Sequence, residues 1–489
     1  MHDPPRGAGA GATRAPDPGG TRRVTLIGVD FGSTTASAVV ASAALTRAAG
    51  TGRVEIGALE ERYRSEMALT PFAGDAVDLD AAAALLDRWL AEAGVEPGSL
   101  FGGGAIITGL AARRRNADAL AQRIRARLGE ALLAVAEDPC LESWVAFMGS
   151  AAPLSRARPG EPLVNLDIGG GTTNLALGLA GEVQRTGCLL VGARHVALDP
   201  RSRRIQALSP EAQAAFDHLG LRRGPGDPLS QAEAEAVAAF HVTLLEAALE
   251  GRADAFAAPA AARHVLVPFV LPEGAAAPTL TFSGGVGELI YAGLAGRPLP
   301  EPAHHGDLGV DLARAILASA RLTARVATPA SMGRATAYGL LRHATQLSGA
   351  TLFLPRPARL PLRDLPILAR LSPASADADL DRAADLFRRS PRGACLEIVL
   401  DDLSAPALRH LGGRLAGALR RAGPIPDHPL VLLTARNAGK ALGGYVTGWG
   451  ALPLDLLVID EVEARGARFV QIGQLCDQVL PVSFYGMTP

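Results

Sequence analysis

Residues 26–35 read Leu-Ile-Gly-Val-Asp-Phe-Gly-Ser-Thr-Thr, and residues 163–172 read Leu-Val-Asn-Leu-Asp-Ile-Gly-Gly-Gly-Thr. The two stretches align without a gap, so that Asp30 matches Asp167 in an internal repeat. In each copy an apolar run ends at the aspartate, a glycine-containing turn follows, and a second apolar run begins. This pattern predicts a strand, a tight turn and a second strand.

The chemistry of the two turns favours a phosphate-binding function. A triphosphate needs backbone N–H donors at close range, which glycines permit because they have no Cβ. Magnesium prefers carboxylates together with retained water, so Asp30 and Asp167 are the candidate metal ligands. A single turn of this kind also occurs in ordinary hairpins, and it is the repetition that favours binding. The candidate phosphate contacts are Gly32, Ser33, Thr34, Thr35, Gly169, Gly170, Gly171, Thr172 and Thr173.

A third glycine-rich motif spans residues 280–288, Leu-Thr-Phe-Ser-Gly-Gly-Val-Gly-Glu. It predicts a strand that reaches a turn at Ser283, Gly284 and Gly285, followed by a helical run from Glu288. Glycines here would let the backbone lie flat against an adenine or a ribose, and Glu288 would accept ribose hydroxyls. An ordinary strand-to-helix turn is the alternative interpretation.

Composition excludes several classes of protein. The 489 residues are 48% hydrophobic with a formal net charge of −1, which disfavours a nucleic-acid or anionic-membrane partner. No uncharged stretch is long enough to span a bilayer. Four scattered cysteines without C-x-x-C spacing argue against a disulfide framework or a zinc site, so we expect a soluble, intracellular protein. Lys440 is the only lysine, so a Walker-type phosphate loop is absent.

The chain is long enough for two or three domains. Residues 1–22 predict a disordered tail, and the pattern of residues 23–348 changes beyond Gly349, which predicts a separate C-terminal α/β domain over 349–489. We expect strands at 105–109, 163–167 and 280–282, and helices at 80–94, 116–136, 209–218, 230–257 and 329–345.

The three motifs in this order resemble the actin and heat-shock chaperone ATPase superfamily. The resemblance implies an actin-like fold with duplicated, ribonuclease H-like α/β lobes and ATP with Mg²⁺ in the cleft between them. It also implies two connecting helices, which match residues 141–151 and 331–339, with Ala335 and Gly339 on one face for a close crossing. Glu142 matches the family's water-positioning residue; a first-turn helix acid is the alternative. Because the family's catalytic lysine is missing, an arginine or slow turnover is expected.

A narrower resemblance links the chain to the ethanolamine ammonia-lyase reactivating factors. The blocks that carry it are residues 105–109, 115–117, 141–143, 334–336, 347–351, 360–366, 439–443 and 458–461. The resemblance implies an ATP-driven chaperone that exchanges damaged cobalamin for adenosylcobalamin in ethanolamine ammonia-lyase. It further implies a cytoplasmic location, in association with the ethanolamine microcompartment. The chain shows no cobalamin-binding signature of its own.

Two rival functions share the same hairpins. A small-molecule kinase would transfer the phosphoryl group to a substrate, and an actin-like filament protein would assemble in the presence of ATP. The role of Lys440 stays open between a partner contact and a solvated loop residue. We expect His195, His304 and His305 to be turn or surface residues and not metal ligands.

Overall fold

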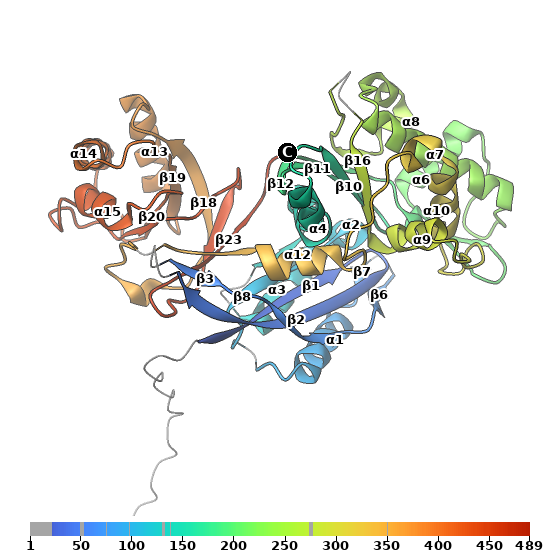
Figure 1. Cartoon of the computed structure of the whole chain (residues 1–489), viewed down its shortest axis with the longest axis horizontal. Helices are drawn as coiled ribbons and strands as arrows, with labels where there is room; N and C mark the ends of the chain where they lie inside the picture. Colours follow the sequence, from blue (N-terminus) through green and yellow to red (C-terminus); the bar gives the residue numbers. More distant parts are fainter. Residues whose placement is uncertain are drawn as a thin grey trace, which may run out of the picture.

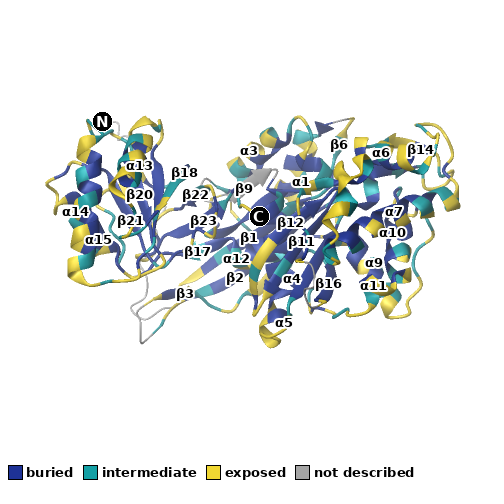
Figure 2. Cartoon of the chain, turned by 90° about the horizontal axis from the view of Figure 1, so that it is seen from above, coloured by how far each residue is buried: buried dark blue, intermediate teal, exposed yellow. Residues whose placement is uncertain are grey.

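The computed structural model describes residues 22–48, 53–74, 76–96, 98–129, 133–136, 138–272, 277–349 and 351–489. The predicted tail therefore lies outside the described residues, except for Arg22. Two adjoining α/β lobes and a C-terminal α/β body are built on three large sheets (Figure 1). The sheets are mostly buried, and exposed residues collect on the outer faces of helices (Figure 2).

The first lobe is built around the first hairpin. Strand β1 (Arg23–Phe31) pairs antiparallel with β2 (Thr35–Arg47) and parallel with β8 (Gly102–Ile107). The sheet order is β3-β2-β1-β8-β9, and β4 and β5 also pair with β2. The remaining elements of this lobe are β3 (Val54–Ile56), β4 (Glu60–Arg64), β5 (Ala68–Leu69), β6 (Phe72–Ala73), β7 (Ala76–Val77), α1 (Leu79–Glu92), α2 (Gly109–Ala112), α3 (Ala117–Leu128) and β9 (Leu133–Ala136).

The second lobe repeats this plan. Strand β10 (Leu163–Ile168) pairs antiparallel with β11 (Thr173–Leu179) and parallel with β16 (Thr279–Ser283), in the order β15-β12-β11-β10-β16. The remaining elements are α5 (Ala152–Ala157), β12 (Glu182–Leu189), η1 (Ala193–His195), β13 (Val196–Leu198), β14 (Ile205–Leu208), α6 (Pro210–Leu219), α7 (Gln231–Leu249), η2 (Ala253–Ala257), α8 (Pro259–Ala262), β15 (Val265–Val267), α9 (Gly284–Leu294), α10 (Gly309–Ala318) and α11 (Ala320–Thr323). The predicted duplicated α/β fold is confirmed.

Helices α4 (Pro139–Ser150) and α12 (Ala335–His343) cross closely between the sheets (Figure 1). A Cβ on Gly149 would lie 2.0 Å from the carbonyl oxygen of Ala335, and one on Gly339 would lie 1.9 Å from that of Val145. No side chain fits at either point, so the two glycines set the helix separation. The predicted connecting helices and their close crossing are confirmed.

The C-terminal body is a seven-stranded sheet in the order β17-β23-β22-β18-β19-β20-β21. Its last four strands in that order are parallel, and helices connect them along the chain. The elements are β17 (Thr345–Leu347), η3 (Pro357–Arg359), β18 (Leu362–Leu371), α13 (Asp377–Arg389), β19 (Ala394–Ile398), α14 (Ala405–Arg421), β20 (Leu430–Leu433), α15 (Gly439–Thr447), β21 (Leu456–Ile459), β22 (Phe469–Ile472) and β23 (Pro481–Tyr485). Strand β17 precedes the predicted boundary and pairs with β23.

Four predictions of element limits are wrong. The helix expected over 230–257 ends at Leu249, shortly before Gly251, which has a φ of +77°. The helix expected over 116–136 ends at Leu128, because Gly129 has a φ of +107°, and β9 then pairs with β8. The helix expected over 329–345 is shorter, and its end is strand β17. The helical run expected from Glu288 already begins at Gly284. In each case a glycine or a strand pairing from a distant segment overrides local periodicity.

The C-terminal body is tied to α4 through its last residues. One Asp138 oxygen caps the helix by accepting the N–H of Leu141 at 3.0 Å. The other accepts the N–H groups of Gly486 at 2.5 Å and Met487 at 3.3 Å. The guanidinium of Arg465 lies 4.7 Å from the ring centroid of Trp144 on the same helix. The helix that carries Glu142 is thus held directly by the C-terminal body.

Candidate functional site

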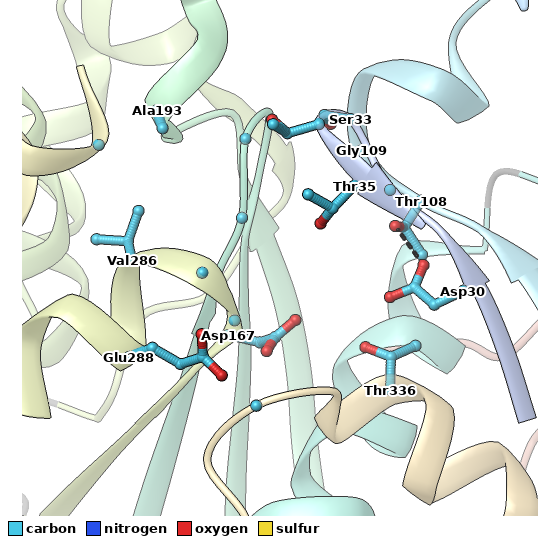
Figure 3. A pocket seen from close by; sticks show the side chains of 18 of the residues that line it. Asp30, Ser33, Thr35, Thr108, Gly109, Asp167, Ala193, Val286, Glu288 and Thr336 are labelled. Carbon is cyan, nitrogen blue, oxygen red and sulfur yellow. Dashed lines mark hydrogen bonds between the residues drawn. The ribbon is translucent and has the colours of Figure 1, made fainter. Parts of the chain in front are cut away.

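A cavity of about 350 Å³ lies between the two lobes. Both hairpins, both crossing helices and the start of α9 contribute to its wall (Figure 3). The predicted site residues that line it are Asp30, Gly32, Ser33, Thr34, Thr35, Glu142, Asp167, Gly169, Gly170, Thr172, Gly284, Gly285 and Glu288. The tertiary structure therefore brings together three motifs that are far apart in the sequence.

The two hairpins close with the same hydrogen bond. The N–H of Gly32 donates to the carbonyl of Thr35 at 2.9 Å, and the N–H of Gly169 donates to the carbonyl of Thr172 at 2.9 Å. Each turn thus stays narrow and places its aspartate beside the cavity. The repeat seen in the sequence is therefore also a repeat in geometry.

The two aspartates point toward each other across the cavity (Figure 3). Burial raises the pKa of Asp30 to about 7; a 2.9 Å hydrogen bond from Thr108 opposes the rise, and the charge of Asp167 adds to it. Burial also raises the pKa of Asp167 to about 6, against a 2.5 Å hydrogen bond from Ser283. Two such carboxylates, with Asp167 buried and Asp30 half-buried, favour a counter-cation.

Glu142 lies in the first turn of α4 and completes an acidic group in the cavity. Burial raises its pKa well above the usual value, and the charges of Asp30 and Asp167 raise it further, while hydrogen bonds from Asn174 and from the backbone of Gly109 lower it. The side chain is buried and not a solvated helix acid. The structure therefore brings Glu142 into the same cavity as both aspartates.

The third motif forms another wall of the cavity. A Cβ on Gly285 would meet no atom within 4 Å, so backbone there is open to a flat ligand. Burial raises the pKa of Glu288, and the Arg334 guanidinium opposes this rise. A Cβ on Gly333 would lie 2.0 Å from a Glu288 oxygen, so a larger residue at position 333 would push this carboxylate out of its present position.

Three of the predicted residues do not line the cavity. Gly171 packs against Leu110. The Thr173 hydroxyl donates to the carbonyl of Val191 at 2.8 Å and is buried in the second lobe. Ser283 acts behind the wall by donating to Asp167. These three residues support the cavity from outside.

Several residues that line the cavity were not assigned to it from the sequence: Thr108, Arg334, Thr336, His305 and Asp307. The sequence does contain a signal for Thr108, because this polar residue directly follows strand β8 within the Ile-Ile-Thr-Gly block. Arg334 lies within the predicted second connecting helix, but its left-handed conformation (φ +58°) puts it just ahead of α12. Its Nη1 is buried without a hydrogen-bond partner among the described residues.

His195 is not a turn or surface residue, so this prediction is wrong. Its ring is buried, with Nε2 2.8 Å from the carbonyl of Gly171 and Nδ1 2.8 Å from the Ser209 hydroxyl. The ring supports the second hairpin from behind. Within the described ranges, no group of three or more His, Cys, Asp or Glu residues forms a metal cluster, and no helix is long and apolar enough to cross a membrane.

The donor set nevertheless fits a magnesium ion held together with a polyphosphate. Magnesium takes hard oxygen ligands and commonly uses one or two carboxylates, the ligand's phosphates and retained water. Asp30 and Asp167 supply two such carboxylates from opposite walls. The Thr34 hydroxyl is buried without a partner among the described residues, which suits a hydroxyl that meets a phosphate oxygen.

Comparisons with known proteins show the family of the chain. The family model for ethanolamine utilisation protein EutA matches residues 22–487. Two relatives carry the name ethanolamine ammonia-lyase reactivase EutA: that of Salmonella typhimurium is 31% identical and that of Escherichia coli 30%, each match covering 93% of this chain and 95% of the relative.

Solved structures of lower similarity include a PPX-GPPA enzyme of Aquifex aeolicus and ethanolamine utilization protein EutJ of Carboxydothermus hydrogenoformans. The first is 13% identical with a TM-score of 0.38, over 65% of this chain and 99% of that one. The second is 17% identical with a TM-score of 0.27, over 61% and 91%. The chain belongs to the family of ethanolamine utilisation protein EutA.

Proposed function

We propose that this protein is an ATP-dependent reactivating chaperone for ethanolamine ammonia-lyase. In this proposal it promotes the exchange of damaged cobalamin for adenosylcobalamin in the inactivated lyase. The observation that carries the ATP-dependent part is the pair of matched hairpins, which place Asp30 and Asp167 opposite each other in one cavity. The names of the two curated relatives support the choice of the lyase as partner.

The residues divide into three roles in this proposal. Asp30 and Asp167 would hold Mg²⁺, which supplies charge neutralisation for the β- and γ-phosphates when bound. The hairpin N–H groups and hydroxyls orient the phosphates. The open backbone at Gly285 and the carboxylate of Glu288 suit the nucleoside end, because a Cβ there would meet no protein atom.

Glu142 and Arg334 are the candidates for hydrolysis. The Glu142 carboxyl would position the attacking water, and its raised pKa makes it a stronger base toward the proton of that water. Arg334 is a cation in the cavity wall and would take the part of the absent lysine. One base and few cations are consistent with slow turnover.

Coupling to the lyase would run through α4. Nucleotide that draws the two lobes together acts on the helix that carries Glu142, and this helix is capped by Asp138, which also holds the backbone of Gly486. A ligand shifts such an equilibrium only by its differential affinity for the two states. The C-terminal body is therefore the proposed output of the ATPase cycle. The proposed location is the cytoplasm, with the lyase and its microcompartment.

The test is a reactivation assay with inactivated ethanolamine ammonia-lyase, ATP, Mg²⁺ and adenosylcobalamin. We expect recovery of deamination with the wild type and none with Asp167→Asn, which keeps the acceptor for Ser283 but loses the charge. Asp80→Asn is the matched control, because Asp80 is an exposed helix acid outside the cavity. Failure of the wild type to restore deamination would refute the proposal. Formation of a phosphorylated small molecule in proportion to ATP consumed would replace it with a kinase.

A further inference from the structure

A second cavity of about 450 Å³ meets the nucleotide cavity at Ser33. Ser33 lines both, and its hydroxyl accepts the N–H of Leu110 at 2.7 Å. The second cavity is walled by both lobes, since Arg113 and Arg114 follow α2 in the first lobe, while Arg194 and Glu211 belong to the second. The hairpin side of the nucleotide cavity, where the proposed phosphates would lie, therefore adjoins an arginine-lined space. We call this space the arginine cavity.

The arginine cavity carries a surplus of positive charge. It contains three guanidiniums and one carboxylate, that of Glu211. Burial lowers the pKa of His195 to about 4, so this ring adds no charge at neutral pH. The surplus faces a space that water or a small anion can enter, because the cavity is open to solvent beside Arg113, whose side chain is 40% exposed.

The three arginines differ in how strongly other protein groups hold their guanidiniums. Arg113 forms an ion pair with Glu211 at 3.1 Å, and this pair joins the two lobes across the cavity. Arg114 lies over the ring of Phe72, 5.2 Å from its centroid. For Arg194, no carboxylate of the described residues lies within ion-pair distance. Its positive charge does act on Asp307, where it partly offsets the rise in pKa that burial causes. Arg194 is therefore the cation most available to a ligand.

We propose that the arginine cavity binds inorganic phosphate, the tetrahedral oxyanion that ATP hydrolysis in the adjoining cavity would release. Guanidinium groups recognise phosphate through paired, charge-assisted hydrogen bonds, and three of them converge on this space. The identification of the source as ATP rests on the proposed function. The anion site itself rests only on the charges and on the volume.

Phosphate in this cavity would also act on the contact between the lobes. An oxyanion near Arg113 competes with Glu211 for the same guanidinium, and the Arg113–Glu211 pair is one of the contacts that joins the lobes. Phosphate bound in the cavity would weaken the Arg113–Glu211 contact and so favour separation of the lobes. Phosphate is thus expected to speed nucleotide exchange.

Equilibrium dialysis with radiolabelled phosphate tests the site directly. The full chain is dialysed at constant ionic strength in chloride buffer, with and without saturating ADP. We expect one saturable phosphate site in both conditions, weakened about tenfold by Arg194→Gln, as for the loss of one charge-assisted hydrogen bond. Arg201→Gln is the matched control, because Arg201 is an exposed arginine of the same lobe that does not line the cavity. Absence of saturable binding, or equal affinity in wild type and Arg194→Gln, would overturn the proposal.

A second arm identifies the source of the phosphate. In a single turnover of ATP, cleavage is followed by acid quench and release by a fluorescent phosphate sensor. A lag between cleavage and release that changes in Arg194→Gln but not in Arg201→Gln assigns the site to product phosphate. An unchanged lag, with dialysis still positive, confines the site to free phosphate and refutes the product role. Absence of ATP cleavage would refute the proposed function, while the dialysis result would still decide the anion site.

Discussion

Asp30 is the residue whose replacement should reveal most about the site. Asp30→Asn removes a carboxyl that burial holds at a pKa of about 7 and replaces it with a neutral group of the same shape. The amide oxygen can still accept the hydroxyl of Thr108, which lies 2.9 Å from Asp30. We therefore expect the nucleotide-free variant to be more stable than the wild type at alkaline pH, although it loses Mg²⁺-dependent nucleotide binding.

The magnitude follows from the shift in the pKa of Asp30. The folded value is raised from 3.8 to about 7, so between these values the folded state holds more protons than the unfolded state, and stability falls as pH rises. This one carboxyl lowers the free energy of unfolding by about 4 kcal/mol at pH 8 and by about 2 kcal/mol at pH 5. The asparagine variant should recover up to these amounts, so its advantage roughly halves between pH 8 and pH 5.

The assay is denaturant unfolding of the nucleotide-free protein at both pH values, with magnesium chelated. Asp80→Asn serves as the control, because the Asp80 side chain is 86% exposed and should give no pH-dependent gain. Calorimetric titration with Mg²⁺ and ATP supplies the second measurement. An Asp30→Asn variant that is equally or less stable than the wild type at pH 8, with no change toward pH 5, would refute the burial argument.

Four further substitutions test other parts of the structure. Ser283→Ala removes the 2.5 Å hydrogen bond that stabilises charged Asp167, so the rise of Mg²⁺–ATP binding with pH should move to higher pH in calorimetric titrations. Gly339→Ala places a Cβ 1.9 Å from a backbone carbonyl of α4 and should cost about 3 kcal/mol by denaturant unfolding. In contrast, Gly413→Ala, with no atom within 4 Å, should stabilise helix α14 by about 0.5–1 kcal/mol. Asp138→Ala should cost about 1 kcal/mol as a lost helix cap and should speed hydrogen exchange of the C-terminal amides that this carboxylate holds; unchanged exchange would contradict the coupling of α4 to the C-terminal body.

Much of the site could be predicted because its chemistry is local in the sequence. A strand that ends in an aspartate and a narrow turn depends on about ten adjacent residues, so both hairpins were found from the repeat. Glu142 was found because it matches the superfamily's water-positioning residue at the start of the first connecting helix. Arg334 was not assigned to the site, because its left-handed backbone and its approach to Glu288 depend on α9, from a distant part of the chain.

Element limits were less predictable for the same reason. Residues 133–136 continue a helical pattern in the sequence, but they pair with β8 once the first lobe has formed. His195 was expected to be a turn or surface residue, yet its two ring nitrogens contact the carbonyl of Gly171 and the hydroxyl of Ser209. Local periodicity contains no information about such partners.

The sequence by itself determined that two hairpins with matched aspartates exist, since glycine, hydroxyl and carboxylate residues at fixed spacing specify tight turns that suit phosphate. Only the tertiary structure decided the environment of those aspartates and therefore their pKa values. Burial raises the pKa values of both aspartates, and the charge of Asp167 adds to the rise for Asp30, because residues 137 positions apart share one cavity. The arginine cavity likewise exists only because Arg113 and Arg194 come from different lobes. Charge acts through space and not along the chain, so the electrostatics of the site required the fold.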